Sequence, residues 1–331
     1  MKTLVMVIGI SGSGKSTISK TFTKPNTLVL SSDETRIEMF KNLEEGNKHN
    51  AEVFQRMQER MLAFFKNNND GTVIYDATNL SRKQRAHVYK LVKIHKVIVE
   101  SVIVFRNPTT AIEWNNTRSG YAKVPENVIE RQFMSLQVPR VGVDTDIIKG
   151  RGESWFNPTL EQQQELLIAE NPLAFLVSIA TPEMSDMLKL NYAPHDTPHH
   201  LESIDTHIKM VTDETKLVAP KLTLASIFHD IGKGYAKGRG INAGTSGQYR
   251  SHDSIGAQIL LNYILFNNGD ITTTNQLHDV ELVNQHMAAH QLNWDNTGKY
   301  QRKHNISFKL LDDLETFADI DSRMRFTSLD K

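Results

Sequence analysis

The chain has 331 residues, with 38 lysine and arginine residues balanced by 38 aspartate and glutamate residues, and it contains no cysteine. This length favours two domains, and the zero net charge argues against a polycation that coats nucleic acid. Without cysteine there are neither disulfides nor thiolate metal sites, and without a run of about 18 apolar residues a membrane-spanning segment is not expected. We therefore expect a cytoplasmic protein, located in the host cytoplasm if a phage encodes it.

Residues 1–150 alternate short β-branched runs with polar segments of helical period. This alternation predicts an α/β domain with a parallel sheet covered by helices on both faces. The expected strands are 4–9, 27–31, 71–77 and 96–105, and the expected helices are 33–44, 51–67 and 81–95.

The segment GISGSGKS, Gly9 to Ser16, follows the first expected strand and matches a phosphate-binding loop. Its backbone N–H groups and the following helix N-terminus suit phosphate oxygens, Lys15 reaches the β and γ phosphates, and Ser16 ligates Mg²⁺. A glycine-rich turn without a ligand is the alternative. The expected nucleotide-binding residues are Gly9, Ser11, Gly12, Ser13, Gly14, Lys15, Ser16 and Thr17, with ATP and Mg²⁺ as ligands.

The next two strands end in carboxylates, at the edge where such sheets bind ligands. Asp33 can take the proton of an attacking hydroxyl, and Arg36, one helical turn further, can hold a phosphate. A purely structural role for Asp33 as a helix cap is the alternative. Asp76 is positioned to hold Mg²⁺ through water.

The phosphate loop, the D-x-x-R pair, the segment DATNLSRKQR and the stretch RNPTTAIEWNNTRSGYAKVPENVIERQF together resemble the kinase module of phage-type polynucleotide 5′-kinases. The resemblance covers about residues 1–140. It implies that Asp33 is the general base toward a 5′-hydroxyl and that Arg36 contacts the phosphate of the acceptor.

The same resemblance makes Arg118 a lid arginine that stabilises the transferring phosphoryl group. The family commonly has a second lid arginine one turn earlier, where this chain has Trp114. Lid function is therefore either reduced or shared with Lys123 or Arg131. Basic residues on the helix after Asp76 either contact nucleic acid or form a solvated face: Arg82, Lys83, Arg85, Lys90 and Lys93.

Between residues 141 and 158 the periodic pattern weakens, and we expect the domain boundary there, with a second domain at 151–331. The second domain is predicted to be all-helical. The expected helical segments are 159–170, 172–180, 200–216, 222–234, 251–266, 279–291 and 306–325.

Most of the histidines fall in this helical half. Each one alone suits a core or surface role, but the ordered set His…His-Asp…His…His…Asp resembles the HD phosphohydrolase superfamily over about residues 195–325. The resemblance implies metal ligands at His207, His229, Asp230 and Asp319, and a second ion held by His252 and His286.

His290 remains an alternative to His286, and the number of ions stays open. Nitrogen and oxygen ligands suit Mn²⁺, Fe²⁺, Co²⁺, Ni²⁺ or Mg²⁺. Lys233 is a candidate for phosphate binding, or else a cation at a helix C-terminus. His195, His199 and His200 are assigned to a proline-rich loop.

Fusions of these two types of domain are known as end-healing enzymes, which implies phosphorylation of 5′-hydroxyl ends and removal of 2′,3′-cyclic, 3′ or 2′ phosphate. RNA is favoured over DNA, and a downstream RNA ligase is a candidate partner. One alternative is a nucleoside or nucleotide kinase fused to a small-molecule nucleotidase; another is an ATP-gated regulator. The sequence leaves open whether the chain forms a homo-oligomer.

Overall fold

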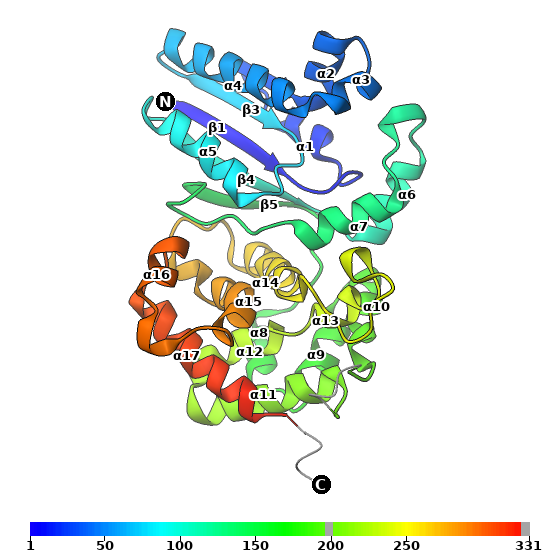
Figure 1. Cartoon of the computed structure of the whole chain (residues 1–331), viewed down its shortest axis with the longest axis vertical. Coiled ribbons are helices and arrows are strands. Elements are labelled where there is room, and N and C mark those ends of the chain that lie inside the picture. Colours follow the sequence, from blue (N-terminus) through cyan, green and yellow to red (C-terminus); the bar gives the residue numbers. More distant parts are fainter. Residues whose placement is uncertain (196–200, 326–331) are drawn as a thin grey trace. The chain divides into compact units, whose positions relative to one another are not determined.

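The computed structural model describes residues 1–195 and 201–325. It divides into two compact units, shown in Figure 1. The first unit is Met1–Ser154 with Asn268–Thr274, and the second is Trp155–Asn267 with Asn275–Lys331.

The first unit is built around a five-stranded parallel sheet in the order β2-β3-β1-β4-β5, which confirms the predicted parallel sheet. Ser31, the last residue of β2, pairs with Asp76, the last of β3, and Val7 near the end of β1 pairs with Asp76 as well. The carboxyl ends of these three strands therefore meet at one edge. The strands are β1 (Lys2–Ile8), β2 (Thr27–Ser31), β3 (Gly71–Asp76), β4 (Ile98–Phe105) and β5 (Ile147–Gly152).

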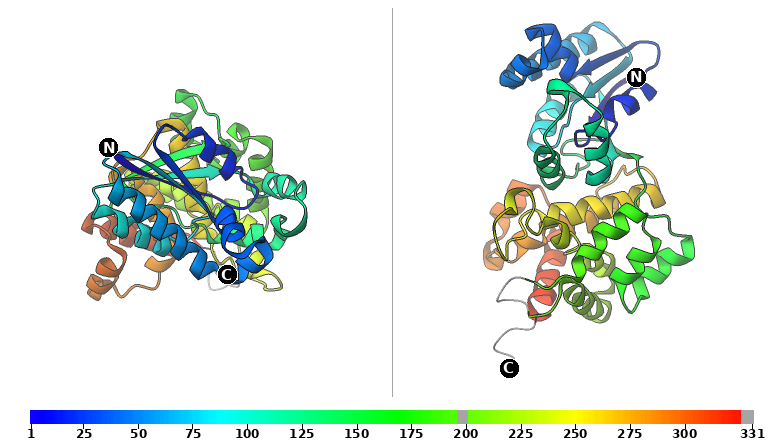
Figure 2. Two further views of the ribbon diagram at one scale, coloured as in Figure 1. Left: turned by 90° about the horizontal axis from the view of Figure 1, so that it is seen from above. Right: turned by 90° about the vertical axis from the view of Figure 1, so that its right-hand side faces the viewer.

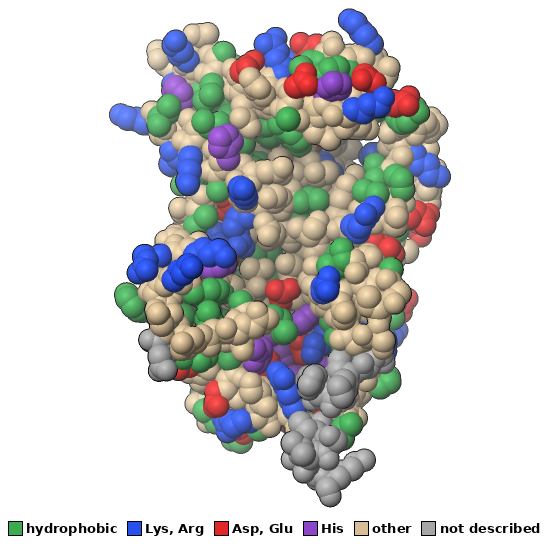
Figure 3. All heavy atoms as spheres, viewed as in Figure 1, with side chains coloured by type: hydrophobic (Ala, Val, Ile, Leu, Met, Phe, Trp, Pro, Cys, Tyr) green, Lys and Arg blue, Asp and Glu red, His purple; other side chains and the backbone are tan. Residues whose placement is uncertain are grey.

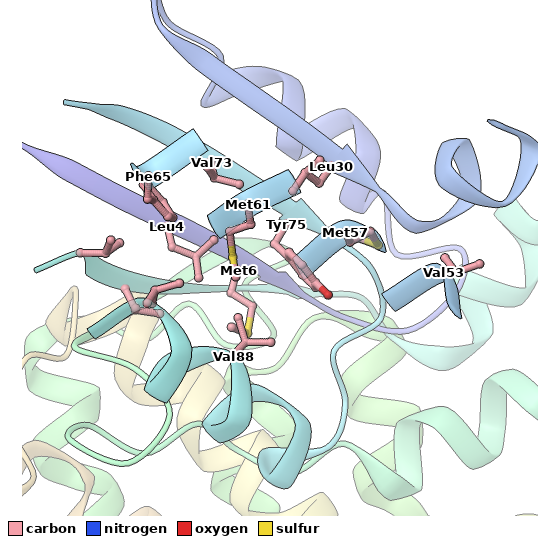
Figure 4. Packing of buried hydrophobic residues seen from close by; sticks show 13 residues of the cluster. Leu4, Met6, Leu30, Val53, Met57, Met61, Phe65, Val73, Tyr75 and Val88 are labelled. Carbon is pink, nitrogen blue, oxygen red and sulfur yellow. The ribbon is translucent and has the colours of Figure 1, made fainter. Parts of the chain in front are cut away.

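Side chains that alternate along β1 build the core on both faces of the sheet. Leu4 and Met6 pack against α4 (Asn50–Asn67) and α5 (Arg82–Lys93), as Figure 4 shows. Val5 and Val7 lie on the other face, where α1 (Lys15–Thr21) packs. The apolar residues of α4 recur every four positions, so a single stripe of the helix is buried. This stripe is Val53, Met57, Met61 and Phe65.

The fifth strand lies within the stretch that the sequence suggested as a boundary. β5 has only two apolar residues, Ile147 and Ile148, before LysGlyArgGly, so its local strand signal is weak. Ile148 also pairs with Ile271 in an antiparallel bridge. Residues 268–274 thus return to the first unit and continue the edge of its sheet.

The remaining helices of the first unit lie in the connections between its strands. The helix expected at 33–44 is interrupted at Lys41, whose φ of 71° ends one helix before the next begins. The helices are α2 (Ser32–Phe40), α3 (Leu43–Lys48), α6 (Pro108–Asn116) and α7 (Glu126–Ser135), with a short 3-10 turn at Gly120–Ala122.

The described part of the second unit is an assembly of helices, as Figures 1 and 2 show. α11 packs against α12 and α17, and α15 packs against α12 and α17. Two helices, α10 and α16, were not expected from the sequence. The helices are α8 (Leu160–Ile168), α9 (Pro172–Ile179), α10 (Pro182–Lys189), α11 (Ile204–Val218), α12 (Thr223–Phe228), α13 (Lys233–Ala236), α14 (His252–Asn268), α15 (His278–Ala289), α16 (Gly298–His304) and α17 (Phe308–Arg323).

Among the described helices of both units, none combines the length and apolar character needed to cross a membrane.

Candidate functional site

The phosphate-binding loop connects β1 to α1 and depends on its glycines. Gly12 and Gly14 have φ angles of 79° and 89°, in the left-handed region that glycine adopts without strain. A Cβ atom on Gly12 would lie 2.1 Å from the carbonyl oxygen of Ala111, so only glycine fits there. At the start of the loop, the backbone N–H of Gly9 donates to the carbonyl of Thr78 at 3.1 Å.

Lys15 lies at the start of α1, and its Nζ donates to the carbonyl of Ile10 at 2.6 Å. Loss of water around Nζ lowers the pKa of Lys15 to about 8, and the negative charge of Asp76 opposes this shift only in part. Asp76 is buried and accepts a hydrogen bond from Ser19 Oγ at 3.0 Å. Ser16 and Thr17 stand exposed at the first turn of α1. The loop, the lysine and the carboxylate therefore lie together at the edge of the sheet.

Asp33 and Arg36 form an ion pair on α2. Arg36 Nη1 lies 2.8 Å from Asp33 Oδ1, and Arg36 Nη2 donates to Asn50 Oδ1 at 2.7 Å. A Cβ atom on Gly46 would lie 2.5 Å from Arg36 Cβ, so this glycine lets the arginine pack closely against α3. The Asp33 side chain stays 68% exposed.

The alternative role of Asp33 as the helix cap is wrong, because the cap of α2 is Ser31. The Ser31 side chain accepts a hydrogen bond from the backbone N–H of Glu34. Asp33 lies inside the first turn, where its carboxylate is available to an acceptor.

In the second unit, four buried histidines are oriented in the same way. The Nδ1–H of His229, His252 and His286 each donates to the carbonyl oxygen three residues earlier, at 2.7, 2.6 and 2.7 Å. His207 Nδ1–H donates to the carbonyl of Met324 at 2.9 Å. Because a carbonyl only accepts, Nδ1 carries the proton in each ring, and Nε2 keeps its lone pair.

These Nε2 atoms converge on Asp230. The Asp230 Oδ2 atom lies 3.4 Å from Nε2 of both His207 and His229. The Oδ1 atom lies 3.2 Å from His252 Nε2 and 3.6 Å from His286 Nε2. Asp230 therefore stands between two pairs of histidines, in two groups whose ligand atoms all lie within 4.8 Å of one another. On the face in Figure 3, histidines of the second unit are visible among acidic and basic side chains.

The donor atoms fit divalent metal ions. His229 Nε2 is buried and has no hydrogen-bond partner among the described residues. His252 Nε2 and His286 Nε2 face each other at 3.2 Å, so two lone pairs oppose one another unless a cation lies between them. Burial works to raise the pKa of Asp230, but the positive charge of Lys233 beside it opposes this effect, and the pKa is held well below its usual range. All ligands are nitrogen or oxygen, as Mn²⁺, Fe²⁺, Co²⁺ or Ni²⁺ prefer.

Comparison with known proteins bears on the first unit. Residues 4–139 match a family model described as an AAA domain. These residues form a P-loop kinase-type module. Such a module binds ATP with Mg²⁺ through its phosphate loop. A search of curated proteins finds no match for the chain.

In the kinase module, Arg118 lies just after α6, near enough to Lys15 to influence its charge. Its guanidinium makes no hydrogen bond or ion pair with another described residue. Lys123 lines a hollow of about 460 Å³ together with Asn47, Gly120, Tyr121, Val124 and Pro125. Arg131 Nε donates to the carbonyl of Asn127. Of these three residues, Arg118 is the one whose positive charge lowers the pKa of Lys15.

The basic helix α5 is not a uniform surface for nucleic acid. Arg85 is fully buried, where its Nε lies 2.7 Å from Asp144 Oδ2, and its other nitrogens donate to three backbone carbonyls. Lys93 pairs with Asp146, and Arg82 donates to the carbonyl of Val138. The sequence pattern predicted a helix here but did not show that Arg85 points inward.

The predicted metal ligand Asp319 does not lie with the histidines. Its carboxylate is 66% exposed and pairs with Arg323 at 3.1 Å. Asp321 takes its place: Oδ1 lies 3.0 Å from His207 Nε2, and Oδ2 lies 2.7 Å from His290 Nε2. Burial works to raise the pKa of Asp321, but its close contacts with His207 and His290 outweigh it and hold this pKa well below its usual range.

His286 and His290, the two alternatives from the sequence, lie in different surroundings. His286 joins the group around Asp230, whereas His290 contacts Asp321 through one ring nitrogen and lies 3.3 Å from Ser322 Oγ through the other. Lys233 begins α13 rather than ending a helix, and its Nζ lies 2.6 Å from Asp230 Oδ2. His195 lies 3.3 Å from this Nζ, while His199 and His200 fall outside the described residues.

Proposed function

We propose that the chain heals broken nucleic-acid ends. The kinase module transfers phosphate from ATP to a 5′-hydroxyl, and the helical unit removes a 3′, 2′ or 2′,3′-cyclic phosphate. The proposal is carried by two sites in one chain. The first unit holds a phosphate loop and an ion pair between the exposed Asp33 and the largely buried Arg36, and the second unit holds a buried Asp230 between two pairs of histidines.

In the first reaction, the Asp33 carboxylate accepts the proton of the 5′-hydroxyl as its oxygen attacks the γ-phosphorus, and ADP leaves. Arg36 holds the phosphate that follows the acceptor nucleoside. Lys15 and Arg118 offset the negative charge on the phosphoryl oxygens during transfer. Mg²⁺, when bound near Ser16 and Asp76, supplies further neutralisation of the phosphates.

The exposure of Asp33 favours the end of a polymer as the acceptor. An enclosed pocket would surround a small substrate, but here the carboxylate of Asp33 is open to solvent. The neighbouring α3 contributes Asn47 to the hollow of about 460 Å³ beside Tyr121 and Lys123. A chain end can approach such a site from solvent while the rest of the polymer stays outside.

In the second reaction, the residues that would hold metal are His207, His229, Asp230, His252, His286 and Asp321. One or two divalent transition-metal ions, when bound, would supply an activated water and neutralise the phosphoester oxygens. The backbone carbonyls fix each imidazole with its Nε2 inward, which preorganises the donor set. The buried Nζ of Lys233 offers a positive charge to a phosphate oxygen.

The kinase assignment is tested with γ-labelled ATP, Mg²⁺ and a 5′-hydroxyl RNA oligomer. Asp33→Asn should lower kcat by roughly 10²- to 10⁴-fold, because the general base is lost while the ion-pair geometry is largely kept. Glu38→Gln is the matched control, since Glu38 lies on the same helix and its carboxylate pairs with Arg60 at 2.8 Å.

Full activity in Asp33→Asn would reject its role as the base. Phosphorylation of mononucleosides without phosphorylation of the oligomer would replace the end-healing assignment by a nucleoside kinase.

A further inference from the structure

Trp114 is an exposed aromatic residue in the kinase module. It lies on α6 and is 47% exposed, whereas Trp155 in the second unit is 1% exposed. The guanidinium carbon of Arg106 lies 3.7 Å from the centroid of the Trp114 ring, so one face of the indole is covered by a cation–π contact. The indole is thus supported on one face and exposed elsewhere.

This stacked pair lies directly beside the phosphate loop. A Cβ atom on Gly14 would lie 3.4 Å from Cζ3 of Trp114 and 3.9 Å from Nη2 of Arg106. Gly14 precedes Lys15, the residue expected to contact the β and γ phosphates. The indole edge therefore lies against the segment of the loop that leads into α1, where the phosphates of a nucleotide are expected to bind.

The position of Arg106 is fixed by the end of the sheet. Arg106 Nη1 lies 2.7 Å from Glu153 Oε1, and Glu153 Oε2 accepts a hydrogen bond from the backbone N–H of Asn107 at 2.8 Å. Glu153 directly follows β5 and Arg106 directly follows β4, so the arginine is held from the end of the neighbouring strand. The Arg106–Trp114 pair is consequently a built surface and not a loose contact between two exposed side chains.

We propose that the Trp114 indole is the stacking platform for the nucleobase of the nucleotide whose phosphates occupy the loop. The base takes the face of the ring that Arg106 leaves free. This proposal rests on nucleotide binding at the phosphate loop but not on the identity of the acceptor. Because every purine presents a flat π-face, the platform stabilises ATP and GTP alike.

The test compares Mg²⁺-bound ATP with Mg²⁺-bound tripolyphosphate, which lacks a base, by calorimetry on the full chain. Trp114→Ala should weaken ATP binding about tenfold and leave tripolyphosphate binding unchanged, because only ATP loses a stacking partner. Trp114→Phe should recover most of the ATP affinity. ATP should also quench tryptophan fluorescence in wild type and in the control Trp294→Phe, but not in Trp114→Phe.

Equal weakening of both ligands would overturn the proposal, because Trp114 would then only support the loop. Unchanged ATP affinity in Trp114→Ala would overturn it as well. Absence of ATP binding by the wild type would reject the phosphate-loop assignment together with this proposal. Trp114→Ala could weaken the binding of ATP selectively while the wild type phosphorylates no 5′-hydroxyl end. That result would support the stacking platform and reject only the proposed acceptor.

Discussion

At the scale of single residues, the sequence placed a metal ligand on the correct helix, α17, but at the wrong aspartate. Asp319 and Asp321 are two positions apart, a rotation of roughly 200° that places them on opposite sides of the helix. The apolar residues Leu314 and Phe317 are buried, and Asp321 continues their spacing. That spacing was the available signal for Asp321, since a carboxylate in an apolar stripe needs a partner.

The metal assignment of Asp321 can be tested directly. Asp321→Asn should lower the amount of Mn²⁺ retained after dialysis, because the carboxylate beside His207 is lost. Asp319→Asn should retain the wild-type amount, since Asp319 pairs with Arg323 at the surface. Metal content by elemental analysis, with circular dichroism as a check on folding, distinguishes the two. Loss of metal in Asp319→Asn alone would contradict the assignment.

Lys15 leads to a prediction about pH. With a pKa of about 8 in the free protein, Lys15 is partly neutral at pH 8.5. Bound phosphates favour the charged lysine and raise its pKa, so ATP binding at pH 8.5 should take up a proton. At pH 6.5 the lysine is already charged and contributes no uptake. Calorimetry in buffers of different ionisation heat measures this, and equal uptake by Lys15→Met at pH 8.5 would contradict it.

At the scale of elements, the central strands of the sheet were predictable from the sequence, and the edge strand β5 was not. β1, β3 and β4 are rich in buried β-branched residues, which give a strong strand signal. β5 has a weak signal, and its pairing through Ile148 with Ile271 joins residues far apart in the chain. Local pattern carries no information about such a pairing.

The attachment of α5 to the sheet domain depends on a buried ion pair. Asp144→Ala would leave the Arg85 guanidinium buried without its carboxylate, and should lower the free energy of unfolding by about 3–5 kcal/mol. Glu38→Ala, which breaks the exposed pair with Arg60, should change it little. Urea unfolding followed by circular dichroism measures both. Equal effects of the two substitutions would show that Arg85 finds another partner.

At the scale of the whole molecule, the sequence indicated two chemistries because each depends on a short local pattern. The phosphate loop needs only Gly9 to Ser16, and the doublet His229–Asp230 marks the second site. What the sequence did not show is the return of residues 268–274 to the first unit, which follows from long-range pairing. The family resemblance implied which residues gather around Asp230, but not the distances that place two histidines near each of its carboxylate oxygens.

The most direct test of the end-healing assignment uses one RNA substrate with a 5′-hydroxyl and a 2′,3′-cyclic phosphate. The wild type with ATP, Mg²⁺ and Mn²⁺ should add a 5′-phosphate and leave no phosphate at the other end. Lys15→Ala should lose only the 5′ transfer, and Asp230→Ala only the removal. Unchanged 2′,3′-cyclic ends in the wild type, with every candidate metal supplied, would contradict the account.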